Sequence, residues 1–180
     1  MFILRCSHAE ESTMKLHIED FPKVVQPVLR YFHVDFDPRR PPSGAEVALA
    51  SLVAVVGSLV VDMALVAVGT RLFPSVRNYG HFHFSDYAKL TVVGVVIACV
   101  AWPIVVRISS KPRWLFFRMA IVVTIVLLAP DVYIWHQGQP AKGVVVLMCM
   151  HLAIALVTYN ALVRIAPTHR HRRRTPAHQA

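Results

Sequence analysis

The sequence predicts an all-α membrane protein, a four-transmembrane-helix bundle with a short N-terminal cytoplasmic arm and a basic C-terminal tail. Of its 180 residues, 56% are hydrophobic, more than the 45–50% that is usual in soluble domains. Four apolar stretches of roughly twenty residues each are long enough to cross a bilayer as helices. Lys and Arg gather between and beyond these stretches. We therefore expect an arm over residues 1–45, a membrane domain over 46–166 and a tail over 167–180.

The first predicted span covers residues 47–69 and is the most apolar stretch of the chain. The run 47–68 is interrupted only by Ser51, Gly57, Ser58 and Asp62. An Asp near the centre of a membrane helix costs about 2.5–3.5 kcal/mol, which the surrounding Val and Leu residues outweigh. The helix is therefore expected to insert with one carboxylate that needs a partner.

The other three spans are predicted over residues 87–106, 114–134 and 143–163. Ser85 and Asp86 are expected to cap the second span, which carries Pro103 near its far end. A proline there removes one backbone hydrogen bond, a loss that neighbouring helices can tolerate. Trp114 and Trp135 would mark the two membrane interfaces at the ends of the third span.

The arm and the tail are the polar parts of the chain. Residues 21–32 place several apolar side chains on one helical face and open with Asp20 as a cap, which indicates an amphipathic segment on the membrane surface. A loop with scattered apolar residues is the alternative, and Met14 could be the true start. The tail is expected to be disordered in solution. Its basic cluster is expected to bind anionic lipid headgroups rather than an acidic partner or nucleic acid, through Arg170, Arg172, Arg173 and Arg174.

The distribution of the 19 Lys and Arg residues predicts the orientation of the chain. Six lie in the arm, four around the connection between the second and third spans, and five at the tail, hence fifteen on one side. The two other connections hold the remaining four. The positive-inside rule then places both termini in the cytoplasm of a multi-pass plasma-membrane protein.

Two titratable side chains inside the spans form a candidate intramembrane polar site. Asp62 and His151 each lie eight residues from the outer end of their predicted helix, roughly 12 Å deep. An Asp–His pair would ease the burial of both groups and fix the imidazole tautomer. Such a pair could serve a proton-linked or ligand-contacting site, or form a purely structural hydrogen bond, or Asp62 could simply be protonated. Asp131 could complete an acidic cluster with Asp62 or sit in the wet interface.

The outer connection between the first two spans carries a second candidate site. In an extended segment, His81 and His83 share one face, with Asp86 near enough to be a third ligand, which allows a divalent-metal or pH-sensing site. Alternatively, the intervening phenylalanines dock the loop and the histidines face water. Bis-histidine haem needs two facing histidines, and His136 lies at another depth than His151. No cofactor is therefore expected.

Short motifs in the second half of the chain resemble a known group of proteins. Residues 146–167 contain Met150-His151-Leu152-Ala153, the third span is preceded by Lys111-Pro112-Arg113, and Pro130-Asp131 lies near its end. Over residues 46–167 this resembles the small, uncharacterised four-helix integral membrane proteins of actinobacteria. The resemblance implies a bacterial plasma-membrane location and a four-span bundle. That group has no established activity to carry over.

Small residues suggest how the spans meet and what the chain does. Membrane helices associate through small-residue faces and polar contacts, and the second span carries such a stripe, which we expect to face the bundle interior: Thr91, Gly94, Ala98 and Ala101. The favoured function is a non-enzymatic scaffold or accessory subunit with a membrane-protein partner, or a homo-oligomer. The alternatives are a proton-linked transport or channel component using Asp62 and His151, and a membrane-embedded redox protein or enzyme.

Overall fold

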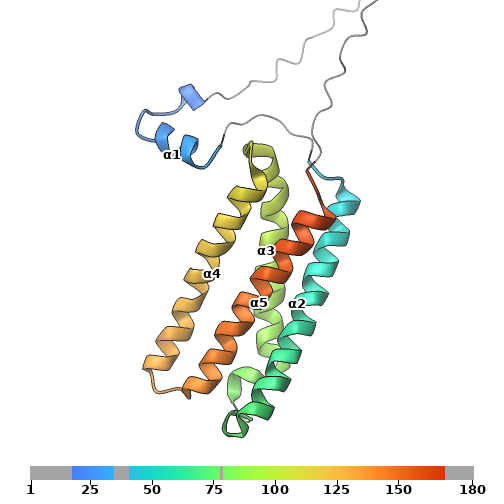
Figure 1. The fold of residues 1–180 in the computed structure, drawn as a ribbon, viewed down its shortest axis with the longest axis vertical. Helices are drawn as coiled ribbons and strands as arrows, with labels where there is room; N and C mark the ends of the chain where they lie inside the picture. The colour runs from blue at the N-terminus through green and yellow to red at the C-terminus, as the bar shows by residue number, and fades with distance from the viewer. Residues whose placement is uncertain (1–17, 35–40, 78, 169–180) are drawn as a thin grey trace, which may run out of the picture.

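The chain folds into a bundle of long helices (Figure 1). The computed structural model describes residues 18–34, 41–77 and 79–168, with the side chains of residues 18 and 81 excepted. Four helices are long and apolar enough to cross a membrane: α2 (Gly44–Leu72), α3 (Phe84–Ile108), α4 (Pro112–His136) and α5 (Ala141–Ile165). Each extends two or three residues beyond the predicted span at both ends. The predicted all-α, four-span architecture is confirmed.

Local chemistry fixes where these helices begin. At α2, the Ser43 Oγ accepts a hydrogen bond from the Glu46 N–H at 3.2 Å, and the Glu46 carboxylate accepts one from the Ser43 N–H at 2.7 Å. This reciprocal capping box satisfies two backbone donors that the first turn leaves open. Helix α4 begins with Pro112, whose missing N–H costs nothing there. The cap predicted at Ser85-Asp86 is wrong, because the N-cap of α3 is His83.

Helix α5 packs against α2, α3 and α4, and its most extensive contact is with α2 (Figure 1). Glycines on α2 permit this closeness. A Cβ added to Gly69 would lie 2.7 Å from a methyl carbon of Val146, and one added to Gly57 would lie 3.1 Å from a methyl carbon of Val157. The α2 backbone therefore touches side chains of α5 at two levels, which is the small-residue packing that membrane helices favour.

Two apolar clusters fill the interior, one toward each end of the bundle. The larger cluster surrounds Trp102, which is fully buried and donates its indole N–H to the Ala166 carbonyl at 2.9 Å. The smaller cluster consists of Tyr87, Val146 and Met150. Because Ala166 follows the last turn of α5, the indole supplies a donor to a helix end that lacks one.

The arm folds against the end of the bundle that carries the α3–α4 connection (Figure 1). Two short helices are described here, η1 (Ile18–Asp20) and α1 (Gln26–Tyr31). The Arg118 guanidinium lies 4.0 Å from the centre of the Trp114 ring and donates a hydrogen bond to the Tyr31 hydroxyl. The predicted cap at Asp20 is wrong, because α1 begins after Val25 with its own proline in the first turn.

Two 3₁₀ turns complete the far end, η2 (Pro74–Val76) and η3 (Gly80–Phe82), both in the connection between α2 and α3. Helices α4 and α5 are joined at the same end by a short turn, in which Gly138 adopts a φ of 86°. A residue with a side chain rarely adopts this conformation, so glycine suits the turn.

Replacing Gly69 with Ala is expected to weaken the bundle. The new methyl group would lie within 2.7 Å of the β-branched Val146, and overpacking of this kind typically costs about 1–3 kcal/mol of unfolding free energy. Reversible unfolding in mixed detergent micelles measures this loss. The matched control is Gly94→Ala in α3, where an added Cβ meets no atom within 4 Å. Equal stability of the two variants would contradict the close α2–α5 contact.

Candidate functional site

Polar side chains also lie inside the bundle. They come from all four long helices, and six of them define what we call the polar layer: Ser58, Asp62, Thr91, Asp131, His151 and Thr158. Along α2, the buried residues run from Ala50 and Ala54 to Ser58 and Asp62, one helical turn apart each time. One face of α2 therefore contributes residues to both the larger apolar cluster and the polar layer.

Asp62 links α2 to α3. Its side chain is fully buried, and the Thr91 hydroxyl donates a hydrogen bond to its Oδ2 at 2.8 Å. The other carboxylate oxygen, Oδ1, has no hydrogen-bond partner among the described residues. The same is true of two further buried hydroxyls in the layer, those of Ser58 and Thr158. Asp62 therefore keeps one acceptor that the protein itself leaves open.

Asp131 and His151 link α4 to α5. The Nδ1 of His151 lies 3.0 Å from the Asp131 Oδ2 and 3.1 Å from the Leu147 carbonyl oxygen. A ring nitrogen that faces two oxygen acceptors carries the proton and donates it. Asp131 is only 5% exposed. The imidazole, whose side chain is 29% exposed, thus lies within ion-pair distance of a buried carboxylate, and intramembrane ionisable groups generally pair in this way.

The three candidate residues fall into two contacts. Asp62 is hydrogen-bonded to Thr91, whereas the His151 Nδ1 is hydrogen-bonded to the Leu147 carbonyl oxygen and lies 3.0 Å from the Asp131 carboxylate. Asp131 is buried in the bundle and is not exposed at the helix end. Of the two candidate carboxylates, Asp131 is therefore the one that lies beside the histidine.

Tyr79 is a neighbour of the layer that the sequence did not reveal. It lies in the α2–α3 connection, is 8% exposed, and packs on α5 so closely that a Cβ on Gly143 would come within 3.1 Å of its ring. Burial raises the pKa of Tyr79, and the charge of Asp131 raises it further. This connection therefore folds its phenol toward the α4–α5 pair. In the sequence, only the small size of Gly143 indicated that another group could pack closely against α5 at this point.

The two other predicted sites are not assembled in the described part of the chain. His83 and Asp86 are both exposed, and the Asp86 carboxylate accepts a hydrogen bond from the Ser85 hydroxyl at 3.2 Å. Among the described residues, no three His, Cys, Asp or Glu side chains gather as a metal site would require. The side chain of His81 lies outside that part, as do Arg170, Arg172, Arg173 and Arg174. The metal and tail-lipid hypotheses stay predictions.

Comparison with known families places the whole bundle in one group. Residues 38–168 match DUF6069, a family of unknown function, over all four long helices and the polar layer. The chain belongs to the DUF6069 family. No curated protein and no solved structure gives a significant match. The DUF6069 assignment agrees with the expected uncharacterised family, while an actinobacterial origin stays a prediction.

A double-mutant cycle measures the coupling within the polar layer of this DUF6069 protein. We expect Asp131→Leu and His151→Leu to couple by about 0.6–1.7 kcal/mol in unfolding free energy, the range found for polar contacts between membrane helices. Each single change removes the ion-pair partner of the other group, so the double variant loses less than the sum of the two single variants. Thr124→Ala is the control for the loss of a buried polar side chain from α4, because the Thr124 hydroxyl donates its hydrogen bond to the Ala120 carbonyl of the same helix at 2.7 Å. Additive effects at 131 and 151 would contradict the pairing.

Proposed function

We propose that this chain is a non-enzymatic scaffold or accessory subunit of the bacterial plasma membrane, with both termini in the cytoplasm. The observation that carries the proposal is the use of the polar side chains. The buried carboxylates contact side chains of neighbouring helices: Asp62 accepts a hydrogen bond from Thr91, and Asp131 lies at ion-pair distance, 3.0 Å, from the Nδ1 of His151. Polar groups used in this way hold a bundle together.

The arrangement of the ends supports the orientation. The start of α2, the end of α5 and the α3–α4 connection lie at the same end of the bundle (Figure 1). In the sequence, fifteen of the 19 Lys and Arg residues belong to the segment before α2, to the surroundings of the α3–α4 connection, or to the segment from the end of α5 onward. The positive-inside rule assigns such an end to the cytoplasm.

The outer surface offers a place for a partner helix. The stripe on α3 was expected to face inward, yet only Thr91 is fully buried, Ala98 and Ala101 are half-buried, and Gly94 is exposed. A Cβ on Gly94 would meet no atom within 4 Å. Helix α4 also diverges from α3 with distance from their connection (Figure 1). A helix of another subunit or of a second copy can approach the α3 backbone closely at this glycine.

Gly94→Leu is expected to reduce association without unfolding the subunit. The added side chain lies outside the bundle, so the unfolding transition should stay near that of the wild type, while the close approach of a partner helix is lost. Chemical crosslinking in native membranes and light scattering of the purified protein in nanodiscs measure assembly. Ile97→Leu, also on the exposed surface of α3, is the control. Unchanged assembly of Gly94→Leu would contradict this association surface.

A second function is favoured by one further observation. The Asp62 Oδ1 is buried without a partner among the described residues, and unpartnered Ser58 and Thr158 hydroxyls belong to the same layer. A carboxylate with an open oxygen can accept a proton or a small cation, so a proton-linked transport or channel component using Asp62 and His151 is the alternative. A narrow bundle of four helices suits this role best as part of an oligomer.

Asp62→Asn separates the two functions. If the chain is a scaffold, the variant should keep its assembly, and its proteoliposomes should dissipate an imposed pH gradient at the same rate as the wild type. A proton-linked transporter would lose that flux, because the amide cannot carry the proton. A pH-sensitive dye inside the vesicles follows the gradient, and Glu46→Gln in the α2 cap is the control for loss of a carboxylate outside the layer.

A further inference from the structure

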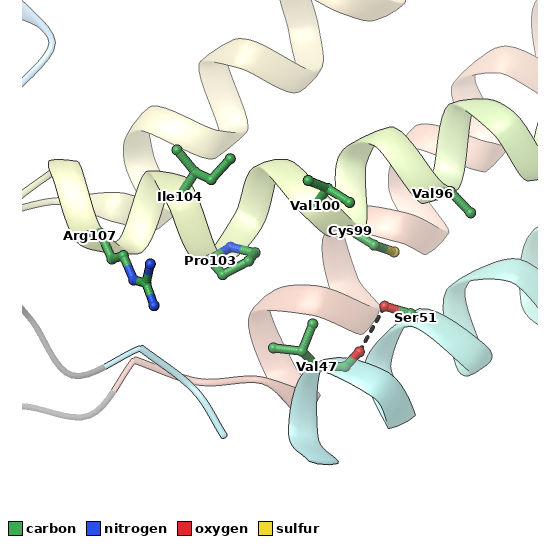
Figure 2. Close-up of a pocket in the computed structure, with 8 residues that line it drawn as sticks. All are labelled: Val47, Ser51, Val96, Cys99, Val100, Pro103, Ile104 and Arg107. Atoms are coloured by element: carbon green, nitrogen blue, oxygen red, sulfur yellow. Dashed lines mark hydrogen bonds between the residues drawn. The ribbon is translucent and has the colours of Figure 1, made fainter. Parts of the chain in front are cut away.

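A groove runs along the outside of the bundle between α2 and α3 (Figure 2). Its volume is about 470 Å³, within the range of sites that bind small molecules. Two residues of α2 and six of α3 line it. Figure 2 shows Val96 at one end of the groove and Arg107 at the other, with the Arg107 side chain extending alongside the helix. The groove is separate from the polar layer and from Gly94.

The lining is almost entirely apolar. Aliphatic side chains of both helices form its walls, Val47 from α2 and Val96, Val100 and Ile104 from α3. The Ser51 hydroxyl at its floor donates to the Val47 carbonyl at 2.7 Å, so it is satisfied within its own helix. Pro103 forms part of the wall and has no side chain that hydrogen-bonds. Such a surface suits a hydrocarbon chain rather than a polar solute.

The length of the groove matches one leaflet of a membrane. From Val96 to Arg107 there are eleven helical steps, which at 1.5 Å each span about 16 Å. The hydrocarbon core of a bilayer is about 30 Å thick, so one leaflet is about half of that. Arg107 lies in the last turn of α3, at the end of the bundle that holds most of the basic residues. The groove thus runs from mid-membrane to the interface.

Arg107 gives the groove a charge at its interfacial end. Its side chain is exposed, and the ion pair found among the described residues, His151 with Asp131, does not involve it. Glu46, the acidic residue in the first turn of α2, accepts a hydrogen bond from the Ser43 N–H in the capping box. A guanidinium binds phosphate through two parallel N–H donors. At the membrane surface, the anion that also carries a hydrocarbon chain is a phospholipid.

We propose that the groove between α2 and α3 binds an anionic phospholipid, with one acyl chain along Val47, Val96 and Val100 and the phosphate on Arg107. The acyl chain packs against the aliphatic walls of the groove instead of against other lipids. The guanidinium binds a negatively charged headgroup more strongly than a zwitterionic one. This binding site does not depend on the scaffold or transport proposals, because it uses neither the polar layer nor the Gly94 surface.

Native mass spectrometry of the detergent-solubilised protein tests the site. Phosphatidylglycerol and phosphatidylcholine with identical acyl chains are added in equal amounts, and the retained lipid is counted for each variant. We expect the wild type to prefer phosphatidylglycerol by about fivefold, since one cation near an anionic surface contributes about 1 kcal/mol. Arg107→Gln should remove this preference. Arg113→Gln, an exposed cation of α4 outside the groove, is its matched control and should retain it.

Filling the groove provides an independent measurement. Val100→Trp places a large side chain in the groove, whereas Val93→Trp places it outside, on a residue of the same helix with nearly equal exposure, 59% against 58%. We expect Val100→Trp to lose the retained lipid and Val93→Trp to keep it, with similar unfolding transitions. The proposal is overturned if the wild type retains both lipids equally, if Arg107→Gln and Arg113→Gln behave alike, or if Val100→Trp keeps the phosphatidylglycerol preference.

Discussion

The close contact between α2 and α5 is the constraint on which the rest of the bundle depends. Lipid chains are as apolar as leucine, so the hydrophobic effect does not drive membrane helices together. Dispersion contacts at short range must do so instead, and Gly57 and Gly69 permit them by bringing the α2 backbone against Val157 and Val146. With this pair fixed, α5 also presents surfaces to α3 and α4, and the two remaining helices take their places around it.

The polar layer follows from this packing. Because α2 turns one stripe inward, Asp62 is buried whether or not a partner is present, and Thr91 of the next helix meets it. On the other side of the bundle, the α4–α5 contact buries Asp131 beside His151. Burial in a medium of low polarity makes each of these bonds costly to break. The same packing leaves the Asp62 Oδ1 without a hydrogen-bond partner among the described residues.

Much of the architecture was predictable, and the detailed pairing was not. An apolar run between polar connections directly indicates a membrane helix, so the ends of all four predicted spans lie within three residues of the helix ends. Asp62 and His151 were also recognised, since titratable residues are rare inside such runs. Their partners depend on the rotation of each helix about its axis, which tertiary packing sets: Gly94 turned outward and Asp131 inward. Tyr79 reaches the layer through a folded connection that no periodic pattern describes.

The lengths of the helices bear on how the protein sits in bilayers of different thickness. Helix α2 has 29 residues and the other three have 25 each, which correspond to about 43 Å and 37 Å. Both exceed the hydrocarbon thickness of about 30 Å, and such a mismatch is relieved by tilt. Because α2 cannot slide along α5 without forcing its glycines past valine methyl groups, the two must tilt as one body. A thinner membrane therefore reorients this pair together, and with it the face that α5 presents to α4.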